Sequence, residues 1–246
     1  MASLSPGMAV FERQEKKYLL NQEQLTCFTQ RAGSRLCTDQ YGLHSIYNIY
    51  YDTDQFDLVR ASIEKPPYKE KLRLRSYGIP RPQDTVYVEL KKKAFGTVYK
   101  RRIPLRLTEA ERYLNHGIHP EDSSQILQEI DYFLQFYHPA PQLWLGYDRV
   151  AYFGTEDEEL RLTVDQRIRS RWDSLQLGAG DGGALLLPDG QCLMEIKTPG
   201  ALPLWLARLL CELSIYPASF SKYGAVYCGA QSIIQTSGRS SCSQAL

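Results

Sequence analysis

Between Lys69 and Arg75 the sequence reads K-E-K-L-R-L-R, so a basic residue stands at every second position. Successive side chains of a β-strand point to opposite faces, and this spacing therefore puts the basic residues on one face. Leu72 and Leu74 lie between them and suit an apolar layer. The stretch predicts a strand with one cationic and one apolar face. A single strand of this kind often shows its charge to water, so its meaning depends on the rest of the chain.

The same alternation recurs along the sequence. Eight segments have the alternation, or the β-branched and aromatic content, that is typical of strands. Turn-rich links such as Gly78–Asp84 and Ala94–Gly96 favour antiparallel hairpins between several of them. The predicted strands are Arg13–Leu20, Ser45–Asp52, Glu70–Ser76, Thr85–Lys93, Thr97–Pro104, Trp144–Phe153, Glu159–Gln166 and Gln191–Lys197.

Helical patterns lie between these strands. Asn21 and Thr108 are side chains that can cap the start of a helix. The predicted helices are Gln22–Arg31, Glu109–Leu114, Glu121–Tyr137 and Pro203–Leu213. We therefore expect one α+β domain over residues 11–230, with a flexible N-terminus over 1–10 and a disordered, Ser- and Gln-rich tail over 231–246.

The composition excludes several classes of protein. The 246 residues include 29 Lys+Arg and 28 Asp+Glu, so no overall field favours nucleic acid or an anionic membrane. No apolar run is long enough to predict a membrane span. The six cysteines show no C-x-x-C spacing and no secretory h-region precedes them, which indicates reduced thiols and a cytoplasmic protein.

The charged strand faces carry mainly lysine and arginine. Closing eight antiparallel strands into a barrel would turn these faces inward and leave the apolar faces for helices to cover. Many buried cations repel one another and lose hydration, so such an interior needs a polyanion or water to fill it. A linear phosphate chain has the required shape and charge. The candidate phosphate-binding residues from alternation are Lys17, Lys71, Arg73, Arg75, Lys91, Lys100, Arg102, Arg149, Arg161 and Lys197.

Single carboxylates are interleaved with these cations. A carboxylate beside phosphates repels them unless a divalent cation bridges the two. Glu195, in the M-E-I-K segment with Lys197 on the same face, is the first candidate metal ligand. Glu15, Glu89 and Asp165 are weaker candidates, because each can instead pair with a neighbouring lysine or arginine.

These segments resemble the VTC domain, the polyphosphate polymerase domain of the vacuolar transporter chaperone family, within the triphosphate tunnel metalloenzymes. Nine landmarks occur in order over most of the chain. They are E-K-K-Y at Glu15–Tyr18, I-Y-Y-D at Ile49–Asp52, K-L-R-L-R at Lys71–Arg75, V-E-L-K at Val88–Lys91, Y-K-R-R at Tyr99–Arg102, Y-D-R at Tyr147–Arg149, R-L-T-V-D at Arg161–Asp165, M-E-I-K at Met194–Lys197 and F-S-K-Y at Phe220–Tyr223.

The resemblance implies an eight-stranded antiparallel β-tunnel, a closed barrel with a basic lumen flanked by helices. It also implies transfer of the terminal phosphate of ATP to a growing polyphosphate chain, with Mn²⁺ or Mg²⁺ as the metal. Arg73, Arg75, Lys91 and Arg149 would then be catalytic, and Glu195 would hold the metal. Lys222 would join the phosphate-binding residues, a role that strand alternation does not reveal.

One departure from the wider superfamily bears on the reaction. Its hydrolases often begin with E-x-E-x-K, whereas this chain has Arg13 at the first position. The missing carboxylate favours phosphoryl transfer over hydrolysis. Hydrolysis of tripolyphosphate or nucleoside triphosphates stays an alternative, as does a polyphosphate-binding module without turnover. RNA binding would want aromatic side chains on the cationic faces, where Tyr87 and Tyr147 lie, but core packing explains most tyrosines better. We therefore expect ATP and inorganic polyphosphate as partners and no nucleic acid.

Overall fold

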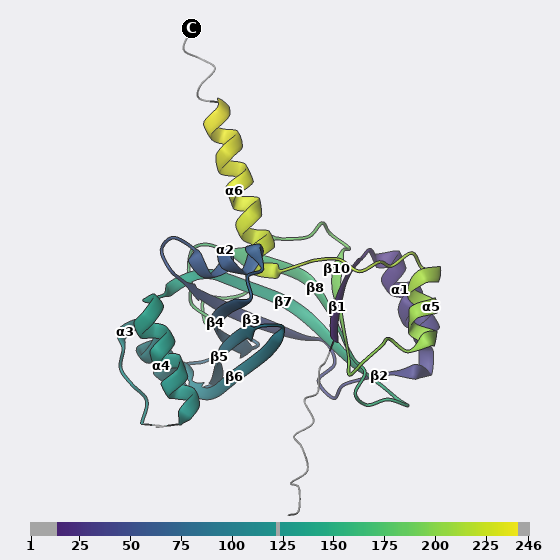
Figure 1. Ribbon diagram of the computed structural model, residues 1–246, viewed down its shortest axis with the longest axis horizontal. Helices are drawn as coiled ribbons and strands as arrows, with labels where there is room; N and C mark the ends of the chain where they lie inside the picture. The colour runs from purple at the N-terminus through teal and green to yellow at the C-terminus, as the bar shows by residue number, and fades with distance from the viewer. Residues whose placement is uncertain (1–13, 122–123, 241–246) are drawn as a thin grey trace, which may run out of the picture.

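The computed structural model describes residues 14–121 and 124–240. One antiparallel sheet occupies the centre, and helices lie around it (Figure 1). The strands are β1 (Gln14–Leu20), β2 (Leu36–Thr38), β3 (His44–Asp52), β4 (Tyr68–Tyr77), β5 (Thr85–Ala94), β6 (Thr97–Arg106), β7 (Ala140–Gly154), β8 (Arg161–Arg171), β9 (Ala184–Leu185) and β10 (Cys192–Thr198). The helices are α1 (Gln22–Ala32), the 3₁₀ turn η1 (Gly33–Arg35), α2 (Asp57–Glu64), α3 (Leu107–His116), α4 (Gln125–Tyr137), α5 (Leu204–Glu212) and α6 (Lys222–Ser240).

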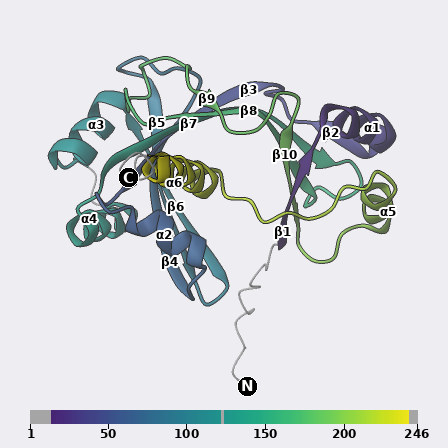
Figure 2. The ribbon, with the colours of Figure 1, turned by 90° about the horizontal axis from the view of Figure 1, so that it is seen from above.

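The eight predicted strands form the body of the sheet, in the order β1-β10-β8-β7-β3-β4-β5-β6. Each neighbouring pair is antiparallel, and the short strands β2 and β9 add to β7 and β8. This confirms the α+β class and the antiparallel strands. Figure 2 shows β1 and β10 on one side of the curved sheet, β4 and β6 on the other, and α6 between them.

The expected closure of the barrel differs from the structure. Over residues 14–121 and 124–240, no strand pairing joins β1 to β6, so the sheet curves around its inner face without forming a ring. Closure depends on the stagger and tilt between neighbouring strands as well as on their number. Alternation reports which face a residue occupies and carries no information about stagger.

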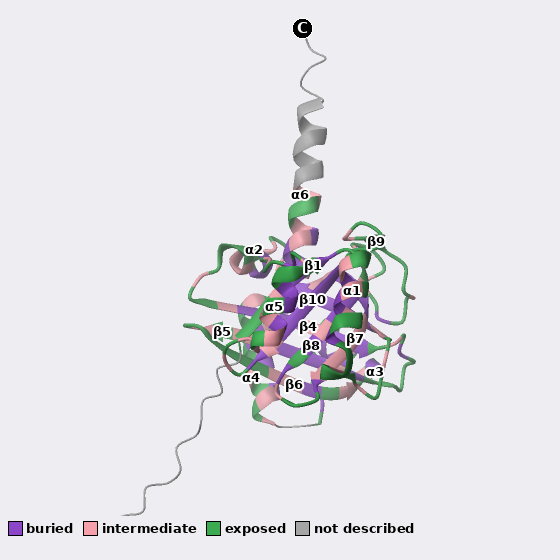
Figure 3. Ribbon diagram, turned by 90° about the vertical axis from the view of Figure 1, so that its right-hand side faces the viewer, coloured by how far each residue is buried: buried purple, intermediate pink, exposed green. Residues whose placement is uncertain are grey.

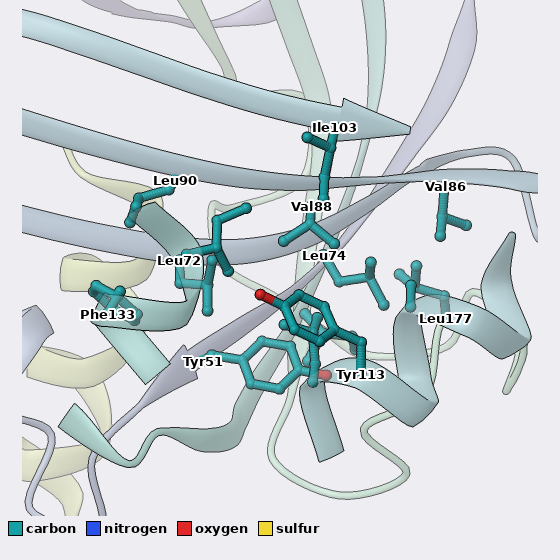
Figure 4. Close-up of a cluster of buried hydrophobic side chains, with 14 of the residues drawn as sticks. Tyr51, Leu72, Leu74, Val86, Val88, Leu90, Ile103, Tyr113, Phe133 and Leu177 are labelled. Atoms are coloured by element: carbon teal, nitrogen blue, oxygen red, sulfur yellow. The ribbon is translucent and has the colours of Figure 1, made fainter. Parts of the chain in front are cut away.

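Apolar clusters cover the outer face of the sheet. One packs Leu72, Leu74 and Val88 against Tyr113 of α3 and Phe133 of α4 (Figure 4). A second packs β1, β8 and β10 against α1 and α5. Figure 3 shows the same division, with buried strands behind helices whose outward sides are exposed. The apolar strand faces thus lie where the alternation predicted, and the charged faces are left for the inner side.

The helix starts differ in part from the expectation. Asn21 caps α1 as predicted, since its side chain accepts from the Gln24 amide at 2.8 Å. The predicted Thr108 cap is wrong, because α3 already begins at Leu107. The amides of Leu107 and Thr108 donate instead to the carbonyl oxygens of Asp84 and Pro82, at 3.0 and 3.2 Å. A neighbouring loop therefore replaces the side-chain cap.

Three further expectations concern the chain ends and the helices beside them. Helix α4 begins at Gln125 with Ser124 as its cap, while residues 122–123 of its predicted start lie outside the described residues. Helix α6 continues to Ser240, whereas we expected a disordered tail from residue 231. Extension of a helix is favoured once it has begun at Lys222, because each added residue gains one backbone hydrogen bond. Residues 1–13 and 241–246, with the predicted flexible N-terminus and Arg13, lie outside the described residues.

Two other expectations can be compared with the described part of the chain. Cys27, Cys37, Cys192 and Cys211 are free thiols there, and Cys242 lies outside it. None of the helices found there is long and apolar enough to cross a membrane.

Candidate functional site

One wall of the site is formed by β4, β5 and β6 and is organised around Glu89. Strand pairing sets Arg73 and Arg102 on either side of this residue, which is 2% exposed. The Glu89 carboxylate lies 2.6 Å from Arg73 Nη2, 3.7 Å from Arg75 Nε, 3.1 Å from Lys100 Nζ and 3.5 Å from Arg102 Nε. Burial alone would raise the pKa of Glu89, but Arg73, Arg75 and Lys100 hold it at about 2. One ionised carboxylate therefore holds four cations on this wall.

The facing wall is formed by β7, β8, β10 and the start of α6. Arg149 donates two hydrogen bonds to the fully buried Asp165, at 2.6 and 2.8 Å. Lys222 Nζ lies 2.6 Å from Asp165 Oδ2 and 3.4 Å from Glu195 Oε1. Lys17 Nζ lies 3.5 Å from the same Glu195 oxygen. Burial opposes ionisation of Glu195, but Lys222, Lys17 and Arg149 hold its pKa well below the usual range.

Helix α6 brings Lys222 to this wall, and a buried carboxylate fixes the helix. Asp52, at the end of β3, accepts hydrogen bonds from the amides of Leu58 and Val59 at the start of α2, at 2.9 and 3.0 Å. The Tyr223 hydroxyl donates to the same carboxylate at 2.9 Å. Asp52 thus connects β3, α2 and α6. Because Lys222 directly precedes Tyr223, the hydrogen bond from Tyr223 to Asp52 also helps to position Lys222.

The two walls enclose a cavity of about 360 Å³, here called the tunnel. Most of the predicted site residues line it, and their roles stay predictions. They are Lys17, Lys71, Arg73, Arg75, Lys91, Lys100, Arg149, Glu195, Lys197 and Lys222.

Two predicted phosphate-binding residues do not line the tunnel. Arg102 reaches Glu89, but its guanidinium lies 3.5 Å from the centre of the Tyr87 ring, so the tyrosine covers one side of it. Arg161 is exposed at the start of β8, with its guanidinium 5.8 Å from the Phe153 ring. Alternation assigns both to the charged face correctly, and it cannot show how far along that face the tunnel extends.

A second hollow of about 730 Å³ adjoins the tunnel and shares Lys17, Lys71 and Lys91 with it. Six of the described lysines line this hollow. Lys17 pairs with Glu15 and Glu195, and we call the other five the lysine vestibule: Lys65, Lys69, Lys71, Lys91 and Lys93. Over residues 14–121 and 124–240 none of the five forms an ion pair with a carboxylate. Burial, with Lys93 and Lys65 nearby, lowers the pKa of Lys69. Glu15 is the one carboxylate among the described residues that line the hollow, so the vestibule has a net positive charge that an anion can neutralise.

Sequence reasoning missed two polar side chains that contact the arginines of the tunnel, and one of them, Tyr50, lines it. The hydroxyl of Tyr50 accepts from Arg73 Nη1 at 3.3 Å, and Asn48 Oδ1 accepts from Arg75 Nε at 2.9 Å. Burial would raise the pKa of Tyr50, but Arg73 and Lys71 lower it to about 8. Alternation along β3 could have found both residues. The run of aromatic residues from Tyr47 to Tyr51 instead predicts core packing, which hides the inward position of these two side chains.

The side chains around Glu195 provide only part of a metal site. Within the described residues no group of three or more His, Cys, Asp and Glu could hold a metal ion. Thr163 pairs with Glu195 across β8 and β10, and its buried hydroxyl oxygen has no hydrogen-bond partner in the described structure. One carboxylate and one free hydroxyl suit a divalent cation whose other ligands are phosphate oxygens, as is usual for Mg²⁺. Glu15, Glu89 and Asp165, the weaker candidates, are each paired with cations instead.

Comparison with known families identifies the family to which this chain belongs. The family model of the VTC domain matches residues 12–229. The chain belongs to the VTC domain family. The match includes every predicted strand, so the resemblance seen in the nine landmarks is confirmed.

Solved structures show that this VTC domain has a tunnel fold. A Bacillus halodurans protein named a "putative adenylate cyclase" matches with a TM-score of 0.52 and 15% identity, over 85% of this chain and 95% of its own. A protein from Hippeastrum, named a "putative adenylyl cyclase" with a dominant triphosphatase activity, matches with a TM-score of 0.54 and 16% identity, over 87% and 95%. At such identities the likeness shows the fold alone. The comparison with curated proteins finds no match.

Proposed function

We propose that this VTC domain is a polyphosphate polymerase that transfers the terminal phosphate of ATP to a polyphosphate chain, with Mn²⁺ or Mg²⁺. The observation that carries the proposal is the lysine vestibule beside the tunnel. An enzyme that only hydrolyses a triphosphate needs the tunnel and no further cationic surface. A polymerase must also bind the chain that it extends. Lysines without a carboxylate partner suit that chain, because each is a flexible point charge that can pair with successive phosphates of a polyanion.

The tunnel side chains support in-line phosphoryl transfer. A terminal oxygen of the acceptor chain forms a bond to the γ-phosphorus of ATP, the bond from that phosphorus to the bridging oxygen breaks, and ADP leaves with the bond's electrons. The acceptor oxygen is already ionised at neutral pH, so no general base is required. Arg73 and Arg149 are oriented by Glu89 and Asp165 before substrate binds, which lowers the cost of aligning them on the transferred group.

A divalent metal fits this scheme at Glu195. That carboxylate and the Thr163 hydroxyl would hold it together with phosphate oxygens of the substrate. When bound, the metal would supply positive charge that neutralises the phosphates near the scissile bond. Lys222 and Lys17 already contact Glu195. With a metal bound at Glu195, both lysines would pair with phosphate oxygens of the substrate.

Hydrolysis of tripolyphosphate or nucleoside triphosphates is the second candidate. The likeness to the Hippeastrum protein, which is described as a triphosphatase, favours it. Hydrolysis benefits from a carboxylate that can take a proton from water. Glu89 is unsuited because four cations hold it ionised with a pKa of about 2. Glu15 has a side chain that is one-third exposed, and it is the better base, although Lys17 and Lys197 both pair with it.

Product analysis separates these functions. We would incubate the protein with ATP and either Mn²⁺ or Mg²⁺ and stain polyacrylamide gels for polyphosphate. Glu195→Gln and Arg73→Ala test the tunnel, and the exposed Glu23→Gln and Arg112→Ala are matched controls. A ladder of long chains in the wild type and the controls, absent in both tunnel variants, is the expected result. Free phosphate without a ladder would establish the hydrolase, and polyphosphate binding without either product would establish a binding module.

A further inference from the structure

The inner faces of β4 and β5 change character from one end to the other. Along β4 the inward side chains are Lys69, Lys71, Arg73, Arg75 and Tyr77, in that order. On the antiparallel strand β5, Lys93 pairs with Lys69, whereas Tyr87 pairs with Arg75. Lysines of the vestibule therefore lie at one end of both strands. At the other end Tyr87 lies beside Arg75, and Tyr77 lies beyond it.

Four aromatic side chains meet at this second end, and we call them the aromatic mouth: Tyr41, His44, Tyr77 and Tyr87. The rings of Tyr77 and Tyr87 are 5.7 Å apart at 80°, and His44 lies 6.1 Å from the rings of both Tyr77 and Tyr41. Arg102 joins the mouth to the tunnel. Its guanidinium covers Tyr87, donates to the Tyr77 hydroxyl at 3.2 Å, and lies 3.5 Å from Glu89.

Two of the four rings of the aromatic mouth are exposed to solvent, unlike the apolar clusters of the sheet. Tyr77 is 49% exposed and Tyr41 is 69% exposed, whereas Tyr18 and Tyr51 in the core are at most 2% exposed. The mouth includes no lysine, so phosphates gain little there compared with the vestibule. A flat ring with an adjacent guanidinium is instead a surface on which a nucleobase stacks.

We propose that the aromatic mouth binds the base of the nucleoside triphosphate, with Tyr77 as its stacking partner. This inference rests on the proposed function and assigns a direction to the tunnel. The nucleoside lies at the aromatic mouth, its phosphates extend past Arg75 and Arg73, and the polyphosphate chain lies toward the lysine vestibule. Stacking accepts every base. His44 Nδ1 lies 3.0 Å from the Gly42 carbonyl oxygen, so this nitrogen is already engaged and does not select a base by hydrogen bonding. ATP and GTP therefore bind with similar affinity.

Equilibrium binding without turnover tests this assignment. The probes are β,γ-imido-ATP, which cannot transfer its terminal phosphate, and tripolyphosphate, which has no base. Tyr77→Ala should weaken β,γ-imido-ATP about tenfold and leave tripolyphosphate unchanged, because base–aromatic stacking of this size is typical. Tyr77→Phe keeps the ring and loses only the hydroxyl that accepts from Arg102, so it should bind both probes like the wild type. Tyr216→Ala, at an exposed tyrosine beyond α5, is the matched control and should change neither.

The contrary outcomes are distinct. Equal weakening of both probes in Tyr77→Ala would show that the tyrosine only positions Arg102, and no weakening would place the base elsewhere; either result overturns the inference while the polymerase assay still stands. Equal affinity of the wild type for both probes also overturns it. A wild type that binds tripolyphosphate but fails to bind β,γ-imido-ATP overturns both the inference and the use of ATP.

Discussion

Arg73 and Glu89 face each other across β4 and β5, with Arg73 Nη2 2.6 Å from Glu89 Oε2. The same carboxylate also serves Arg75, Lys100 and Arg102, so it is the shared counter-ion of one wall of the tunnel. The tunnel thus has fixed cations before any phosphate arrives. Much of its geometry depends on a residue that no phosphate would contact favourably.

Removal of the Glu89 carboxylate should destabilise the protein, and the stability of the variant should then depend on a bound anion. We expect Glu89→Gln to lower the free energy of unfolding by about 3–5 kcal/mol, because the buried Arg75 and the half-buried cations beside it lose their shared partner. Tripolyphosphate should restore more stability to the variant than it adds to the wild type. Urea unfolding with and without tripolyphosphate measures both effects. Glu212→Gln, which breaks an exposed pair with Arg31, should cost less than about 1 kcal/mol.

Binding of polyphosphate should weaken as the pH rises from about 7 to 9. Burial, with Lys91 and Lys69 nearby, lowers the pKa of Lys71 to about 8, and Tyr50 has a pKa of about 8. A bound polyanion favours the protonated form of both groups and raises both pKa values. Below pH 8 both are already protonated and binding takes up no proton; above pH 8 binding must take up protons, so affinity falls. Isothermal titration at several pH values in two buffers measures this uptake, and a Lys71→Arg, Tyr50→Phe double variant that kept the full pH dependence would contradict the assignment.

The lysine vestibule should matter for long chains only. Replacing Lys65, Lys69 and Lys93 by alanine should reduce the affinity for long polyphosphate at least tenfold and leave tripolyphosphate within about twofold. The salt dependence of long-chain binding should become shallower, since fewer counterions are released. Titrations at several salt concentrations check this. An equal loss for both ligands would show that the vestibule and the tunnel act as one site.

The anchor of α6 should affect the site from a distance. In Asp52→Asn one carboxylate oxygen becomes an amide nitrogen that faces donors, so we expect a loss of about 1–3 kcal/mol in the free energy of unfolding. Because Lys222 precedes Tyr223, polyphosphate binding should also weaken. Denaturant unfolding and binding titrations test the two effects together. Unchanged binding in a destabilised variant would show that Lys222 is held by Asp165 and Glu195 alone.

The sequence was most informative where one residue type repeats with the period of a strand. Lys71, Arg73 and Arg75 lie on the inner face as expected, because the pleat leaves them no other choice once Leu72 and Leu74 are buried. Helix α2 was not expected, since the carboxylate that caps its first turn comes from Asp52, outside the helix. The free hydroxyl of Thr163 and the tunnel role of Tyr50 depend on which strands pair. The open line between β1 and β6 depends on stagger, which a local pattern does not record.

That open line has a mechanical consequence. Over the described residues, β6 pairs only with β5. The free edge of β1 meets the segment at Pro217 and Ala218 through a single bridge, so main-chain hydrogen bonds do not join β1 to β6. The wall can widen there without breaking a ladder, whereas widening at any of the seven other junctions would break several hydrogen bonds at once. Glu15 and Lys17 on one side of the line and Lys100 on the other all face the tunnel. A ligand wider than the tunnel would therefore be accommodated by separation of β1 from β6. The distances between the arginines on β4 and β7 would not change.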